Sequence, residues 1–126
     1  MFDLDDIAID KGKTTGGVWK PITGDARVKV AKGDNPRYRA AVVKYQKKFC
    51  GGVVDPLSEE FEKAVNYAMA DAILLDWENI AIKGETLPYS FENAVEVLSD
   101  YPEFRELISS YSLDSDNFRP DEVAKK

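Results

Sequence analysis

The chain has 126 residues, of which 44% are hydrophobic and 32% charged, and these values are typical of a single globular domain. It has no histidine and one cysteine, Cys50, which excludes a histidine-dependent catalytic triad, an imidazole metal ligand, an internal disulfide and a zinc or iron–sulfur site. The formal net charge of −6 repels phosphates, so we expect no nucleic-acid partner.

Residues 1–16 are expected to form a flexible N-terminal segment. Residues 2–6 include three aspartates where a secretory signal needs a basic start and an apolar centre, so we expect the protein to stay in the cytoplasm. Gly12-Lys13-Thr14 matches the end of a phosphate-binding loop, but that motif needs a glycine five residues before Gly12, where Ile7 stands. The sequence therefore predicts no P-loop.

Residues 17–31 predict a β-hairpin. Hydrophobic Val28 and Val30 alternate with Arg27 and Lys29 after a turn at residues 23–25, and this period of two is typical of a strand with one buried face. Pro21 cannot donate a backbone hydrogen bond, which confines the first arm of the hairpin to a sheet edge.

A first long helix is predicted to begin at Asp34-Asn35-Pro36, where a capping residue precedes a proline suited to the first helical position. Gly51-Gly52 ends it. Its apolar residues recur at helical spacing and form one stripe, which comprises Tyr38, Ala41, Val42, Tyr45 and Phe49.

A second helix is predicted over about residues 59–77, after a start signal at Asp55-Pro56 or Ser58. Its apolar residues cover most of the circumference of the helix, so we expect it to be the central helix, packed on several sides. The longest uncharged apolar run of the chain, residues 72–75, lies in it and is far too short to cross a bilayer. We therefore expect no membrane association.

Two shorter helices follow a turn at residues 83–85. Ser90 caps the first of them, and the second begins at residues 100–103, where Asp100 and Glu103 have the spacing of a capping box and Pro102 lies near the start. Residues 114–126 form a polar tail whose only large apolar residue is Phe118. The predicted fold is mainly α (α+β), a small N-terminal β-hairpin followed by about four helices, in one domain over residues 17–113.

Asp76 and Glu78 flank Trp77, and two carboxylates beside an indole could serve as a general acid and base. The other interpretation is that Trp77 ends an apolar helix face while its neighbours point to water or pair with cations of the first half. We favour this second interpretation, because a lone Asp-Trp-Glu has little motif specificity. A metal-dependent enzyme would have only carboxylates to use, namely Asp71, Asp76, Glu78 and Glu92.

Charge is distributed unevenly along the chain. Residues 1–52 carry 11 Lys and Arg against six Asp and Glu, a net charge of +5, whereas residues 53–126 carry six against 17, a net charge of −11. The two halves are expected to attract each other or a neighbouring copy.

Cys50 has no histidine to activate it and is expected to be an inert thiol. The residues alone thus predict an interaction domain with no catalytic, cofactor-binding or metal site.

Two stretches of the chain, AKGDNPRYRAAVVKYQKKF and AMADAILLDWENIAIKGETLPYSFENAVEVLSDYPEFRELI, resemble the tail assembly chaperones of long-tailed bacteriophages. The resemblance covers roughly residues 26–118. It is carried by the order and spacing of a basic Asn-x-x-Tyr helix, an Asp-Trp-Glu segment, a glycine turn and a Leu-Pro-Tyr-Ser start of the next helix.

The resemblance implies a non-catalytic protein that binds the tape measure protein, keeps it soluble and helps to recruit tail tube subunits. It also implies a homo-oligomer that works in the cytoplasm of the infected or lysogenic host and is absent from the mature virion. The alternative is a structural head–tail or tail completion protein that is retained in the virion. We expect the partner surface to use aromatics near helix ends and in the tail, namely Tyr89, Phe91, Phe104, Tyr111 and Phe118.

Overall fold

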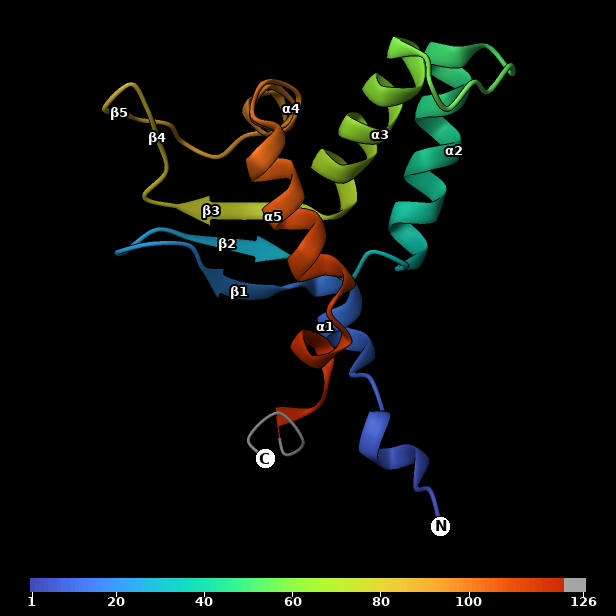
Figure 1. Cartoon of the computed structure of the whole chain (residues 1–126), viewed down its shortest axis with the longest axis vertical. Helices are drawn as coiled ribbons and strands as arrows, with labels where there is room; N and C mark the ends of the chain where they lie inside the picture. Colours follow the sequence, from blue (N-terminus) through green and yellow to red (C-terminus); the bar gives the residue numbers. More distant parts are fainter. Residues whose placement is uncertain (122–126) are drawn as a thin grey trace.

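A computed structural model describes residues 1–121, which form a small antiparallel sheet with helices packed beside it and over it (Figure 1). The helices are η1 (Leu4–Ile7), α1 (Lys11–Gly16), α2 (Pro36–Cys50), α3 (Glu59–Ala72), α4 (Phe91–Asp100), α5 (Pro102–Leu113) and η2 (Ser115–Phe118). The strands are β1 (Val18–Pro21), β2 (Arg27–Val30), β3 (Leu74–Glu78), β4 (Ala81–Ile82) and β5 (Glu85–Thr86). The predicted fold class is confirmed.

The predicted hairpin is present as β1 and β2, which pair antiparallel with Val18 opposite Val30. It belongs to a larger sheet, because β3 pairs with the other side of β2 and gives the order β1-β2-β3. Pro21 lies on the edge strand, as its missing N–H requires.

The second predicted helix is wrong beyond Ala72, where α3 ends and the chain turns into β3. Leu74 and Trp77 are both buried although they are three residues apart, a spacing that imitates a helix. The cause is a β-bulge, since Lys29 pairs with Asp76 but Val30 pairs with Leu74, leaving Leu75 as an extra residue. Asp76 and Glu78 are therefore strand residues and do not lie at a helix C-terminus.

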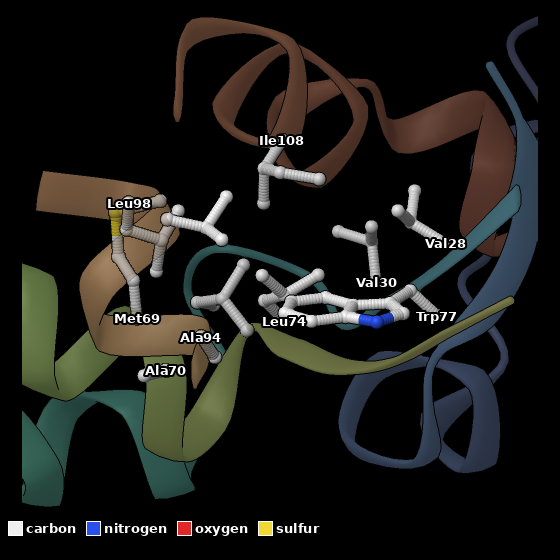
Figure 2. Packing of buried hydrophobic residues seen from close by; sticks show 11 residues of the cluster. Val28, Val30, Met69, Ala70, Leu74, Trp77, Ala94, Leu98 and Ile108 are labelled. Atoms are coloured by element: carbon white, nitrogen blue, oxygen red, sulfur yellow. The ribbon is translucent and has the colours of Figure 1, made fainter. Parts of the chain in front are cut away.

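One face of the sheet packs against the C-terminal helices to form the main core. Figure 2 shows Ile108 of α5 pointing toward the side chains of Val28 and Val30 of β2 and Trp77 of β3. Met69 and Ala70 from α3 and Ala94 and Leu98 from α4 complete the cluster at its other end.

A second core lies between α2 and α3, which form a helical hairpin at the upper right of Figure 1. Buried Tyr45 and small alanines of both helices fill it, and the small side chains allow close packing. The buried Asn35 ties the start of this hairpin together: its Oδ1 accepts from the Tyr38 amide at 2.9 Å, and its Nδ2 donates to the carbonyls of Lys32 at 2.6 Å and Ala72 at 3.3 Å. The predicted cap thus also ties the start of α2 to the end of α3.

The N-terminal segment at residues 10–16 meets the C-terminal end of the described chain in the lower part of Figure 1. The amide of Asp10 donates to the carbonyl of Phe118 at 2.8 Å, and the ammonium of Lys13 donates to the carbonyl of Arg119 at 3.0 Å. Within the segment predicted to be flexible, residues 4–7 and 11–16 are helical. Phe118 is fully buried and anchors the predicted polar tail, of which residues 122–126 lie outside the described part of the chain.

Candidate functional site

An open groove of about 620 Å³ runs between the corner that joins α4 to α5 and the small β4–β5 hairpin. Its walls are mainly apolar, and two carboxylates lie on its lining. The residues that line it are Ile80, Ala81, Ile82, Val97, Asp100, Tyr101, Pro102, Glu103 and Phe104.

The helix corner is built by Pro102. The proline ring disfavours the helical region for the residue before it, so α4 ends here and Tyr101 takes φ −125° and ψ 83°. Pro102 then stands in the first turn of α5, where its missing N–H costs nothing. Asp100 is the last residue of α4, and no side chain caps α5, so the predicted capping box is wrong. With one residue between two helices, Tyr101 is left 44% exposed on the groove.

The opposite wall is a hairpin of two-residue strands. Lys83 and Gly84 both have positive φ, 52° and 82°, as a tight hairpin turn of two residues requires. Such a short hairpin is unstable alone. It is held by two hydrogen bonds of Leu87, whose amide donates to the Ile80 carbonyl at 2.8 Å and whose carbonyl accepts from the indole Nε1 of Trp77 at 2.7 Å.

Tyr89 supports the same indole from the side. Its ring meets that of Trp77 edge to face, with centroids 5.0 Å apart and an angle of 86°, and its hydroxyl donates to the carbonyl of Leu74 at 2.8 Å. Burial raises the pKa of the Tyr89 hydroxyl, and the nearby Asp76 carboxylate raises it further, so the hydroxyl stays protonated and able to donate. Trp77 and Tyr89 therefore position the groove wall from within the core.

Glu78 beside Trp77 pairs with a cation of the first half, as the structural interpretation predicted, although Trp77 lies on strand β3 and does not end a helix face. Glu78 accepts two hydrogen bonds from the guanidinium of Arg27, at 2.6 and 2.9 Å, and this contact lowers the pKa of Glu78. Asp76 accepts from the amide of Trp77 at 2.8 Å. Asp71 on α3 accepts from Arg37 at 2.9 Å and from the hydroxyl of Tyr45 at 3.3 Å. Each pair with an arginine joins the basic half of the chain to the acidic half.

Nothing in residues 1–121 brings three or more acidic or cysteine side chains together as a metal ion would require. Asp71 lies on α3, Asp76 and Glu78 on β3, and Glu92 on α4. The described residues also contain no helix that is long and apolar enough to cross a membrane.

The five predicted partner residues have different places. Phe104 lines the groove, whereas Tyr89 lies behind its wall and Phe118 is fully buried. Phe91 packs edge to face on Tyr67 with centroids 5.8 Å apart, and the hydroxyl of Tyr111 donates to the carbonyl of Pro21 with Lys20 over its ring.

The structure adds groove residues that the sequence reasoning did not select, chiefly Ile80, Ile82 and Tyr101. Alternation of Ile80 and Ile82 before a glycine turn was a usable signal for a short strand. The exposure of Tyr101 had no such signal, because it depends on how α4 and α5 meet.

Comparison with known proteins gives one family. The profile of the family described as YdaY prophage protein matches residues 27–126, which include every element from β2 to η2. Neither a curated protein nor a solved structure matches the chain.

Proposed function

The chain belongs to the YdaY prophage protein family, and we propose that this phage-derived protein is a tail assembly chaperone. It binds the tape measure protein, keeps it soluble and helps to recruit tail tube subunits, and it has no catalytic role. It acts in the cytoplasm of the host and is left out of the finished virion. The resemblance of residues 26–118 to such chaperones supports this proposal, and the phage origin of the family agrees with it.

The groove at the α4–α5 corner is the observation that carries the proposal. A tape measure protein is a long helical chain that exposes apolar faces until the tube encloses it. Helices of this kind bind by placing a few side chains of one face into an apolar groove. A volume of about 620 Å³ has room for several large side chains, and Tyr101 and Phe104 offer flat apolar surfaces to them.

The predicted aromatics take different parts in this proposal. Phe104 contacts the partner directly, together with Tyr101, Ile80 and Ile82. Tyr89 does not contact the partner but positions the groove wall by packing against Trp77. Phe91, Tyr111 and Phe118 contribute through the packing of the helices that carry the groove.

Co-expression with the tape measure protein tests the proposal. We expect the partner to be soluble and to copurify with the wild-type chain, and to precipitate with a groove variant carrying Ala81→Asp and Tyr101→Asp. Both positions are exposed, so the folded state should survive. The matched control carries Val53→Asp and Leu57→Asp, which add the same charge to exposed apolar positions before α3, outside the groove lining. It should behave as the wild type.

Three outcomes separate the alternatives. If the partner is insoluble even with the wild-type chain, the chaperone proposal is wrong. If both variants keep it soluble, the chaperone proposal stands but the groove is not the contact surface. If mass spectrometry finds the chain in purified virions in stoichiometric amount, a structural tail component replaces the chaperone.

A further inference from the structure

Residues 1–9 form an N-terminal arm that extends away from the body of the molecule (Figure 1). Phe2 and Leu4 are 67% and 72% exposed, and Ile7 is also exposed. η1 buries none of its residues, and the hydrogen bonds of this segment within the described chain join Asp3, Asp5, Asp6 and Ala8 to one another. The arm thus presents large apolar side chains to solvent.

The arm has an apolar side and an acidic side. Leu4 and Ile7 are one turn apart in a helix of three residues per turn, so they lie on the same side of η1. Asp5 and Asp6 lie on the other two sides of η1 and are exposed. Residues 1–10 contain four aspartates and no lysine or arginine. A surface that accepts this arm should therefore be both apolar and basic.

The outer face of α2 has these properties. Ala40, Val43, Lys44 and Lys47 lie on one side of the helix at three- and four-residue spacing, opposite the stripe that packs on α3. All four are exposed, Val43 to 51%. Residues 36–50 carry five basic side chains and no acid, and no ion pair found within residues 1–121 involves Lys44 or Lys47.

We propose that the arm of one copy docks on the outer face of α2 of a second copy. Leu4 and Ile7 cover Ala40 and Val43, and the arm aspartates face Lys44 and Lys47. Within one copy the arm points away from α2, which leaves α2 of a neighbour as the complementary surface (Figure 1). Each copy has one arm and one such face, so a reciprocal exchange closes a two-fold dimer. This contact is separate from the groove and does not depend on the proposed function.

Charge reversal in two complementary variants tests the contact. The arm variant carries Asp5→Lys and Asp6→Lys, and the helix variant carries Lys44→Glu and Lys47→Glu. Asp3 is kept because its carboxylate caps η1 by accepting from the Asp5 amide. We expect sedimentation to show a wild-type dimer of twice the 14.1 kDa chain mass and at least a tenfold rise in the dimer Kd for each variant.

Mixing the two variants in equal amounts should restore a dimer, because each arm then meets an outer face of opposite charge. A control with Glu96→Lys and Glu106→Lys reverses two exposed acids elsewhere and should remain as dimeric as the wild type. A monomeric wild type, a dimer that neither variant weakens, or a mixture that stays monomeric would each overturn the proposal. Circular dichroism of every variant identifies any that has lost its fold, and the mixture remains the deciding sample.

Discussion

Trp77 connects the buried sheet to the wall of the groove. Its ring lies in the main core at 4% exposure, while its Nε1 reaches out to the carbonyl of Leu87, the residue that follows β5. An aromatic side chain with one polar atom can fill both roles, whereas an aliphatic one cannot. The acids on either side of it hold strand β3 through hydrogen bonds, and the indole holds the groove wall through its bond to Leu87.

Trp77→Phe should lower the free energy of unfolding by about 1–3 kcal/mol, because the Leu87 carbonyl loses its donor and the core loses volume. Urea denaturation measures this loss. Trp19→Phe is the matched control, since Trp19 is half-buried on edge strand β1, and it should cost less than about 1 kcal/mol. Equal losses for the two variants would contradict the role assigned to Trp77.

The Arg27–Glu78 pair predicts a pH dependence. Arg27 lowers the pKa of Glu78 in the folded state, so the pair stabilises the protein above the ordinary glutamate pKa and loses this effect as pH falls through the lowered value. The wild type should therefore have a higher Tm than Glu78→Gln at pH 7, and the difference should shrink toward zero in acid. A difference that grows as pH falls would contradict this sign. Glu96→Gln, at an exposed position without an ion pair in residues 1–121, should show no such trend.

Gly17 joins α1 to strand β1 at a point where the backbone passes close to β2. Its φ of 81° and ψ of 168° belong to a region that other residues rarely adopt. A Cβ there would lie 2.9 Å from Cδ1 of Leu75 and 3.2 Å from the carbonyl oxygen of Val30. The junction of α1 with the sheet therefore requires glycine.

Gly17→Ala should destabilise the protein by about 2–3 kcal/mol, from backbone strain and the close approach of Leu75 and Val30. The matched control is Gly24→Ala in the β1–β2 turn. Gly24 also has a positive φ, 58°, but an added Cβ there meets nothing within 4 Å, so the loss should be about 1 kcal/mol. Thermal unfolding of both variants shows which one loses more stability. An equal loss of stability would contradict a steric effect at Gly17.

The sequence was sufficient where the signals are local. Asn35 and Ser90 cap α2 and α4 as expected, and the alternation around Val28 correctly gave strand β2. The prediction from the sequence failed at residues 74–78. Strand β3 is fixed by hydrogen bonds to β2, about 47 residues earlier, and its bulge interrupts the two-residue alternation that would mark a strand. The groove was missed for the same reason, since β4, β5 and the α4–α5 corner come together only in the folded chain.

Segments far apart in the sequence support each other where α1 meets η2. η2 contacts both α1 and α5, and its Phe118 is fully buried, with the backbone carbonyl accepting from the Asp10 amide. The C-terminal anchor thereby holds the base of the arm. The oppositely charged halves of the chain are also joined by two ion pairs, Arg27 with Glu78 and Arg37 with Asp71.

Phe118→Ala should lower the free energy of unfolding by about 3–5 kcal/mol, because it leaves a large cavity at a fully buried position. Hydrogen exchange of the Asp10 and Thr14 amides should also become faster, since α1 loses its neighbour. Leu113→Ala, at a residue 74% exposed, is the control and should change neither quantity appreciably. If exchange in residues 10–14 stayed at the wild-type rate, the coupling of the two ends would be wrong.

In the proposed complex, the groove at the α4–α5 corner holds an apolar helix of the tape measure protein. Photo-crosslinking can locate this contact: a photoreactive amino acid is placed at position 101 in the complex purified after co-expression, and position 113, on the exposed end of α5, is the control. We expect crosslinks from position 101 to apolar helical segments of the partner and few from position 113. A complex that crosslinks equally from both positions, or only from position 113, would contradict it.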